Sequence, residues 1–385
     1  MKIYLDNAAT SYPKPTCVIK AMEDYFYNIG VNTGRGGYEN SIKGSRLLYD
    51  SRENVCSLFN FDKPSNVIFT QNVTASLNII LKSVIKDSWS VITTSMEHNS
   101  VLRPLKALEN SRNIKLNVLY CEENGKLSIE KLKNFINKDT KLLVISISSN
   151  VVGTIQQVEE IGQICKDNNI LFILDAAQGA GYLDIDFKRM NLSALAFTGH
   201  KGLLGPQGTG GFIISDELND LASTYMEGGT GSFSESISHP LILPDKFEAG
   251  TLNTLGIAGL NAAINFIKSV GIRNIREKEE YLSEIFLQDL LNIDELIVYG
   301  PKNAESITPV FSVGCNKIDP SELCFILDSE YKIMTRCGLH CAPLAHKTIG
   351  SFPSGTVRFS IGYFNDINDI KSAVTALNNI IKGCD

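Results

Sequence analysis

The stretch ALAFTGHKGLLGPQGTGG, residues 194–211, joins a short apolar run to a glycine-rich turn. The apolar residues end in Thr198, His200 and Lys201, and five glycines follow between positions 202 and 211. The phosphate-binding pattern GxxxxGK[ST] is absent, so Lys201 is not the lysine of a nucleotide-binding loop. A lysine held at a strand end by small residues suits another role, an amine that binds a flat cofactor as a Schiff base. On these residues alone, an ordinary surface lysine is equally well supported.

Seven short β-rich runs include this stretch and alternate with segments of helical periodicity. Apolar residues at three- and four-residue spacing, as in SLNIILKSVI and EEIGQICKDN, predict helices between the strands. Strand alternating with helix predicts an α/β fold, a mainly parallel seven-stranded sheet flanked by helices. The predicted strands are 66–70, 89–94, 114–120, 141–147, 170–175, 194–199 and 210–215.

Ligands of such sheets bind at the carboxyl ends of the strands, and polar residues concentrate there. Asp175 ends the apolar run ILFILD, where a buried carboxylate needs a cation or strong donors. The protonated ring nitrogen of pyridoxal phosphate is such a cation, and the pairing makes the ring an electron sink. A helix-capping role for Asp175 is the alternative. Asp175 and Lys201 are one strand–helix–strand unit apart, so both can reach one cleft.

Other strand ends supply further candidate ligands. TQNVT leads into a helix beginning near Val73, whose free N–H groups and dipole attract a phosphate, and Thr74 adds a hydroxyl. Asn72 as a simple N-cap without a ligand is the alternative. His98, in SMEHNSV, could stack on a pyridine ring. Donors to a phenolic oxygen are offered by two more residues, Asn150 and Gln178.

Composition restricts the class of partner. The 385 residues include 36 lysines and arginines and 42 acidic residues, a formal net charge of -6. This balance and the lack of a long basic run argue against a nucleic-acid surface. The longest apolar runs are far shorter than the roughly 20 residues that cross a bilayer, so no membrane span is expected. Nine irregularly spaced cysteines and no signal-peptide pattern predict reduced thiols and a cytoplasmic location.

The pattern changes after the seventh strand. Loops rich in glycine, serine and threonine occupy 216–256, and one long helical stretch follows at 254–292. Short strands in IVYG, PVFSVG and TVRFSIG then alternate with helices at 319–329 and 366–382. We expect two domains, a large cofactor-binding domain of residues 16–255 and a small α+β domain of residues 1–15 and 256–385.

The stretch RCGLHCAPLAH, residues 336–346, holds two of the nine cysteines and two of the five histidines. One interpretation is a zinc site of Cys337, His340, Cys341 and His346, although structural zinc usually takes a second, distant ligand pair. The other interpretation is a reactive thiol, and it is the one we adopt, with no metal expected.

Taken together, these motifs resemble the class V aminotransferases of the fold type I pyridoxal-phosphate enzymes. Among them, the cysteine desulfurases and selenocysteine lyases of the SUF-type, group II kind are the most similar. The resemblance implies pyridoxal 5'-phosphate as cofactor and a homodimer with shared active sites. It extends over nearly the whole chain through YLDNAATSYPKP, TQNVT, MEHNSV, SSNVVGT, DAAQ, TGHKGLLGPQGTG, FEAGTLN, RCGLHCAPL and VRFSIGYFN.

The resemblance implies a role for each matching residue. Lys201 would bind the cofactor covalently, Cys341 would be the catalytic cysteine, and His98 would stack on the ring and carry protons. Arg358 would hold the substrate carboxylate, which a guanidinium fork fits well, with Ala8 and Asn150 beside it. The implied cofactor-binding residues are Asn72, Val73, Thr74, His98, Asn150, Asp175, Gln178, Thr198, His200, Lys201 and, from the neighbouring subunit, Thr251.

The activity implied by the resemblance is conversion of L-cysteine to L-alanine, with the sulfur passing to Cys341 as a persulfide. A sulfur-acceptor protein would then receive it. Selenocysteine lyase activity is one alternative, and a class V aminotransferase or lyase in which Cys341 has no chemical role is another. A cofactor-binding scaffold without turnover is the non-enzymatic alternative.

The chain departs from the group II pattern at two places. Gly34 stands where a histidine is usual, and HCAP is one residue shorter than the usual HCAxP. Cys337, four residues before Cys341, is expected to be a packed thiol, with interception of the persulfide as the alternative.

Overall fold

The central element of the structure, a computed structural model that describes residues 2–34 and 36–383, is a seven-stranded sheet. Neighbouring strands pair in parallel except at β8, which runs antiparallel to both β2 and β7. The predicted mainly parallel seven-stranded sheet is therefore confirmed. Its order is β2 (Val67–Thr70), β8 (Gly210–Ile214), β7 (Ala194–Thr198), β6 (Leu171–Asp175), β5 (Thr140–Ser146), β3 (Ser90–Thr94) and β4 (Lys115–Leu119).

Helices cover both faces of this sheet, because side chains of consecutive strand residues point to opposite faces. In β6, Phe172 and Leu174 belong to one buried cluster, while Ile173 between them belongs to the other. The Ile173 face is covered by α3 (Val73–Val84), α4 (Asn99–Arg112) and α7 (Asp216–Leu221). The opposite face is covered by α1 (Thr16–Asp24), α2 (Glu39–Leu58), α5 (Ile129–Phe135), α6 (Val158–Asp167) and α8 (Thr254–Val270).

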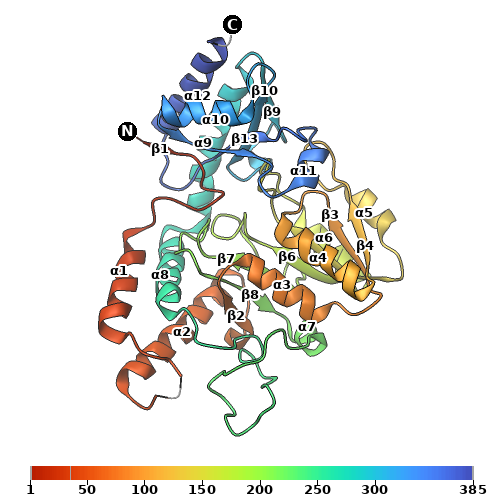
Figure 1. Ribbon diagram of the computed structural model, residues 1–385, viewed down its shortest axis with the longest axis vertical. Helices are drawn as coiled ribbons and strands as arrows, with labels where there is room; N and C mark the ends of the chain where they lie inside the picture. Colours follow the sequence, from red (N-terminus) through yellow and green to blue (C-terminus); the bar gives the residue numbers. More distant parts are fainter. Residues whose placement is uncertain (1, 35, 384–385) are drawn as a thin grey trace.

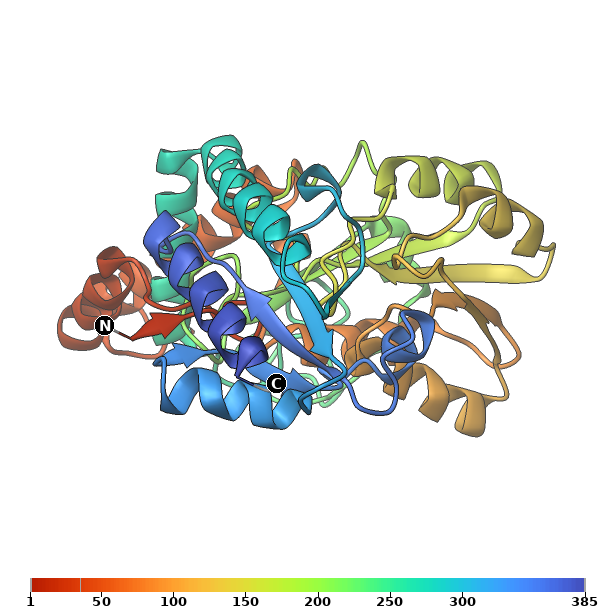
Figure 2. The ribbon, with the colours of Figure 1, turned by 90° about the horizontal axis from the view of Figure 1, so that it is seen from above.

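A second, smaller body lies above the first in Figure 1. Its sheet is antiparallel, in the order β12 (Arg336–Gly338), β13 (Thr356–Ser360), β10 (Val310–Cys315) and β9 (Leu296–Tyr299). Its helices α9 (Ile272–Leu291), α10 (Pro320–Ser329) and α12 (Ile367–Lys382) share a separate buried cluster with these strands. Figure 2 shows α10 and α12 side by side over the strands, with the short α11 (Pro343–Thr348) reaching towards the large sheet.

The helical stretch predicted at 254–292 is confirmed, and it consists of two helices, α8 and α9. Gly271 has a φ of 88°, a left-handed value that ends α8, and α9 leaves at an angle of 78°. Among the described residues, no single helix is long and apolar enough to span a membrane; α8 and α9 together meet that test by length and composition, as a bent pair.

The N-terminal segment belongs with the small body. β1 (Ile3–Tyr4) pairs in parallel with β11 (Ile333–Met334), and Asp6 bridges to Ser360 at the end of β13. These contacts agree with the expected grouping of residues 1–15 with the C-terminal part. They also bring the segment after β1 to the edge of the large sheet, since Ser11 N donates to the His200 carbonyl.

The predicted domain division at 255/256 remains a proposal, and the packing favours a later position. α8 packs against α1 and α2 and belongs to the same buried cluster as they do. The first residue of α9 that belongs to the buried cluster of the small body is Leu282. We propose that the division falls within α9.

Candidate active site

A cavity of about 280 Å³ lies at the carboxyl ends of the parallel strands, between the large sheet and the small body. Every predicted cofactor or substrate residue except Thr251 lines it. These are Ala8, Asn72, Val73, Thr74, His98, Asn150, Asp175, Gln178, Thr198, His200, Lys201 and Arg358. The principle that polar residues at strand ends converge therefore located the cavity correctly.

Lys201 and Asp175 are the central pair of charges in the cavity. Burial lowers the pKa of Lys201 to about 8; Arg358 and Arg336 act in the same direction, whereas Asp175 opposes them. Burial raises the pKa of Asp175, although its Oδ1 accepts a hydrogen bond from Ala177 N at 2.9 Å. That bond closes a turn, and turns rather than a helix follow β6, so the helix-capping alternative for Asp175 is wrong. The low pKa of Lys201 makes its amine available as a nucleophile and base near neutral pH.

The turn that carries Lys201 packs directly on the turn after Asp175. Gly181 has a φ of 103°, and a Cβ built on it would lie 2.1 Å from the Gly202 carbonyl oxygen. Only glycine permits this approach of the two backbones. The glycine-rich sequence around Lys201 thus has a packing reason, which fixes the lysine next to Asp175.

His98 caps α4 and faces the cavity. Its Nδ1 accepts a hydrogen bond from Ser100 N at 3.0 Å, so the ring proton is on Nε2. Burial, followed by Lys201, lowers the pKa of His98 to about 4, which keeps the ring neutral. The structural interpretation of a strand-end histidine holds here, and it leaves the ring available for stacking.

One end of the cavity offers the ligands of a phosphate. Asn72 is the N-cap of α3, and its Oδ1 accepts from Ala75 N at 2.9 Å. A cap of this kind is compatible with an anion at the same helix end. Thr198 Oγ1 and His200 Nδ1 line the cavity, are buried, and have no hydrogen-bond partner. Because buried polar groups are almost always paired, these atoms indicate a polar ligand at this place. The residues present therefore fit pyridoxal phosphate, with a carboxylate for the ring nitrogen, an amine for the aldehyde and donors for the phosphate.

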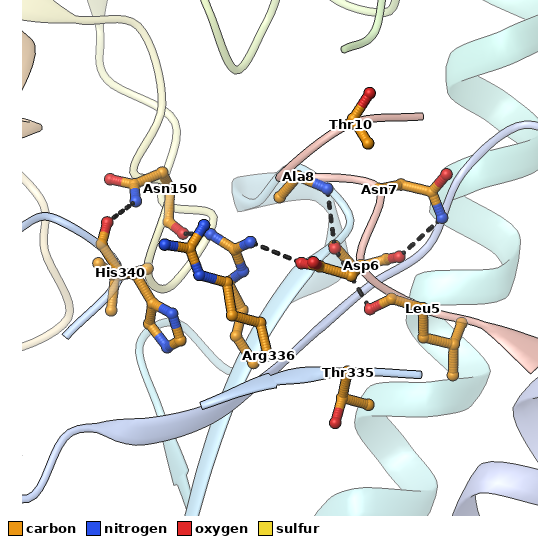
Figure 3. A network of polar contacts seen from close by, with 12 residues as sticks. Leu5, Asp6, Asn7, Ala8, Thr10, Asn150, Thr335, Arg336 and His340 are labelled. Atoms are coloured by element: carbon orange, nitrogen blue, oxygen red, sulfur yellow. Dashed lines mark hydrogen bonds and ion pairs between the residues drawn. The ribbon is translucent and has the colours of Figure 1, made fainter. Parts of the chain in front are cut away.

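Arg358 enters the other end of the cavity from β13. It is 1% exposed, and its Nη1 and Nη2 donate to the Asn150 carbonyl at 3.0 Å and to Asp6 Oδ1 at 2.8 Å. These bonds hold the guanidinium between the N-terminal segment and the loop of Asn150, and Figure 3 shows Asp6 and Asn150 on opposite sides of the site. Arg358 Nε is buried without a partner. This fixed cation suits a carboxylate ligand.

Cys341 stands at the mouth of the cavity rather than in its wall, and it is exposed. His340 and Cys341 have φ values of 46° and 59°, a left-handed conformation that costs energy for non-glycine residues. Backbone bonds hold this strained turn, since Asn150 Nδ2 donates to the His340 carbonyl and Asn99 N donates to the Cys341 carbonyl, both at 2.8 Å. α11 begins at Pro343, only two residues after Cys341, because HCAP lacks the residue that precedes the proline in the usual HCAxP.

The zinc interpretation of residues 336–346 finds no support. Within residues 2–34 and 36–383, no three His, Cys, Asp or Glu side chains are grouped to hold a metal ion. His340 Nε2 contacts Thr356 Oγ1, and His346 Nδ1 contacts Ser351 Oγ. Cys337 packs on the small-body cluster beside Cys324, as expected for a packed thiol.

Sequence reasoning assigned no site role to Arg336 or Glu97, nor to Ala9, Ser100, Ser146, Ser148 and Ala177, which line the cavity. Arg336 lines the cavity, and its Nη2 lies 3.9 Å from Cys341 Sγ. Glu97 does not line the cavity, but it is 1% exposed and its Oε2 accepts from N and Oγ of the lining residue Ser146 at 2.7 Å, which ties the end of β3 to the end of β5. The available signals were an arginine in the same motif as Cys341 and a glutamate directly before His98.

Thr251 lies outside the cavity of its own chain. It lines a neighbouring cavity of about 540 Å³ together with Asn72 and Thr74, and another of about 510 Å³ together with Gly34. Thr251 therefore lies beside the α3 N-terminus, and Gly34 shares a second cavity with it.

Comparisons with known proteins give a consistent result. The profile of the family Aminotransferase class-V matches residues 3–372. A probable cysteine desulfurase of Methanothermobacter thermautotrophicus is 33% identical over 98% of this chain and 94% of its own length. One from Pyrococcus abyssi is 34% identical over 99% and 94%. Among solved structures, the apo cysteine desulfurase of Thermococcus onnurineus NA1 is 32% identical, with a TM-score of 0.93 over 99% of this chain and 95% of that one.

Proposed function

This chain belongs to the class-V aminotransferase family, and we propose that it is a pyridoxal-phosphate-dependent cysteine desulfurase. The observation that carries the proposal is one cavity that combines a lysine of lowered pKa, a buried carboxylate and a fixed arginine, with an exposed cysteine at its mouth. The names of the relatives above support the same activity.

The cofactor would be held by residues already described. Lys201 would bind its aldehyde, Asp175 its ring nitrogen, and Thr198 and His200 its phosphate at the N-terminus of α3. When bound, pyridoxal phosphate supplies an electron sink for the bonds at the Cα of an amino acid. Gln178 would reach the phenolic oxygen, although its Nε2 already donates to the Ala8 carbonyl at 3.0 Å.

The chain's own residues would then divide the work on L-cysteine. Arg358 binds the α-carboxylate, beside Ala8 and Asn150, and places Cα near Lys201. The Lys201 amine, with its pKa of about 8, takes the Cα proton and later returns a proton to carbon. Neutral His98 presents its Nε2–H to the same cavity and serves as the second proton carrier.

Cys341 is the proposed sulfur acceptor. Its thiolate attacks the substrate sulfur, an S–S bond forms, and the Cβ–S bond breaks with its electron pair going to carbon. Protonation of that carbon completes L-alanine. The net reaction converts Cys341 and L-cysteine to a Cys341 persulfide and L-alanine, with no other oxidant or reductant.

A homodimer with shared sites is part of the proposal. The position of Thr251, beside Asn72 and Thr74 but outside the chain's own cavity, supports a contribution to the site of a second copy. A sulfur-acceptor protein would remove the persulfide at the exposed position of Cys341. A cytoplasmic location is also proposed, because the eight described cysteines are all free thiols.

The test is the visible spectrum of the holoenzyme before and after L-cysteine, with alanine and sulfide measured under reducing conditions. Cys341→Ala should lose sulfide release, and Cys337→Ala, the matched control, should keep it. Full turnover by Cys341→Ala would show that the thiol has no chemical role. L-selenocysteine run in parallel ranks the lyase alternative by kcat/KM, and a spectrum that no amino acid changes would indicate a scaffold.

A further inference from the structure

Two arginines stand side by side at the mouth of the cavity. Arg336 of β12 and Arg358 of β13 are direct cross-strand partners in an antiparallel pair, so their side chains lie on the same face. Like charges in this arrangement destabilise a sheet unless anions offset them. Both residues line the cavity.

Only one of the two has a carboxylate partner. Arg358 is paired with Asp6, whereas Arg336 has no carboxylate within 4.0 Å among the described residues. The hydrogen bond that the structure gives the Arg336 guanidinium is to sulfur, from Nη2 to Cys341 Sγ at 3.9 Å. Figure 3 labels Arg336 between Asn150 and Asp6; the bonds drawn to those two residues are the ones that Arg358 makes.

The position of the sulfur is imposed by the backbone. Two consecutive left-handed residues, His340 and Cys341, are held by bonds from Asn150 and Asn99 to their carbonyl groups. Strain of this kind persists where surrounding contacts over-determine it. The chain thus uses strained backbone to present Sγ to the guanidinium.

We propose that Arg336 is a catalytic residue that stabilises the anionic form of the Cys341 sulfur and orients it towards the cavity. The charge of Arg336 offsets that of the thiolate before sulfur transfer and of the terminal sulfur of the persulfide after it. Cys337 cannot take this role, because alternation along β12 turns its side chain away from Arg336, towards the small-body core. The role of Arg336 in turnover rests on the proposed function. The effect of Arg336 on the Cys341 sulfur does not, and it can be tested without turnover.

The test measures the sulfur directly. Holoenzyme is treated with iodoacetamide from pH 6 to pH 10, and alkylation of Cys341 is followed by peptide mass spectrometry, with Cys337 as an internal reference for unfolding. Only the thiolate reacts, so the rate reports the anionic fraction. The variants are Arg336→Met, Arg336→Lys and the control Lys347→Met, which removes a cation of α11 that lies against the Phe352 ring.

Two unit charges about 4 Å apart in water attract by ~1 kcal/mol, which corresponds to roughly fivefold in an equilibrium. Arg336→Met should therefore slow alkylation at pH 7 by about fivefold. Arg336→Lys should restore much of the rate, and Lys347→Met should match the wild type.

A Cys341 profile unchanged in Arg336→Met would overturn the inference, and so would an equal slowing in Lys347→Met or a lysine variant as slow as the methionine variant. If Cys337 reactivity shows that Arg336→Met unfolds, the comparison of Arg336→Lys with the wild type carries the test. Retained turnover in Cys341→Ala would contradict the persulfide mechanism alone, because it leaves the alkylation profile untouched.

Discussion

The ion pair of Arg52 and Glu248 should be the most sensitive point of the large domain. Arg52 Nη1 and Nη2 bind Glu248 Oε1 and Oε2 at 3.0 and 2.7 Å, and the side chains are 9% and 5% exposed. Glu248 Oε1 also accepts from Phe69 N at 2.7 Å, so the pair connects α2 with the edge strand β2. β2 leads directly to Asn72, which lines the cavity at the N-terminus of α3.

Glu248→Gln keeps the shape of the side chain and leaves the Arg52 charge buried and unpaired. Removing one partner of a buried ion pair costs about 3–5 kcal/mol. With a urea m-value of roughly 3 kcal/mol/M, the unfolding midpoint should fall by about 1 M or more. Far-UV circular dichroism of the apo protein in urea measures this shift.

The double variant Arg52→Met, Glu248→Leu is the matched comparison. Replacing both charges with apolar residues of similar volume is often neutral or stabilising, so the midpoint should return close to that of the wild type. A Glu248→Gln midpoint within about 0.3 M of the wild type, or a double variant less stable than the single one, would refute the reasoning.

Three further outcomes follow from the buried groups. Glu279 is buried near Tyr182, Arg276 and Lys278, and burial raises its pKa to about 8. Because the folded protein holds this proton more tightly than the unfolded chain does, the proton contributes stability that is fully present below about pH 4.5. This stability is lost as the pH rises through 8. The wild type should therefore lose stability between pH 5 and 9 more steeply than Glu279→Gln in urea titrations, and parallel curves would contradict this. Thr198→Val should leave the Tm of the apo protein unchanged, because Oγ1 has no partner, and should weaken pyridoxal phosphate binding by roughly 10–100-fold in a spectroscopic titration; equal affinity would remove Thr198 from the phosphate site. Gly181→Ala should destabilise by about 1–3 kcal/mol or more, because its Cβ meets the Gly202 carbonyl; an unchanged urea midpoint would mean that the two turns separate freely.

The sequence predicted the large domain well because its signals are local. All seven strands of the large sheet lie within the predicted runs or one residue beyond them, since buried parallel strands are short apolar runs. The helical stretch at 254–292 was also predicted, but its division into two helices at Gly271, whose φ is positive, was not. The pairing of β1 with β11 and of β12 with β13 could not be predicted from the sequence. These strands are only two to five residues long, and each partner is either distant in sequence or very short.

The site shows the same limit. Residues that directly follow strands, such as Asp175, Asn150 and Lys201, could be placed in one cavity from topology alone. Arg336 could not, because its position depends on the register between β12 and β13, which places it opposite Arg358. Glu97 was not predicted, because the prediction for this strand end rested on its neighbour His98. The hydrogen bonds of Glu97 to Ser146 depend on the pairing of β3 with β5, which is not apparent from the sequence.

The attachment of the N-terminal segment to the small body orders the events of folding. Ala8 N donates to Ser360 Oγ, and Arg358 Nη2 donates to Asp6, each across 352 positions of the chain. Contacts this distant close late, because the entropy of so large a loop is lost before the contacts form. During synthesis, the large sheet is complete long before β11 and β13 leave the ribosome, and residues 3–8 must wait without their partners. The Arg358 end of the cavity therefore forms after the end that holds Lys201, and a chain stalled before residue 333 would have the Lys201 end without either arginine.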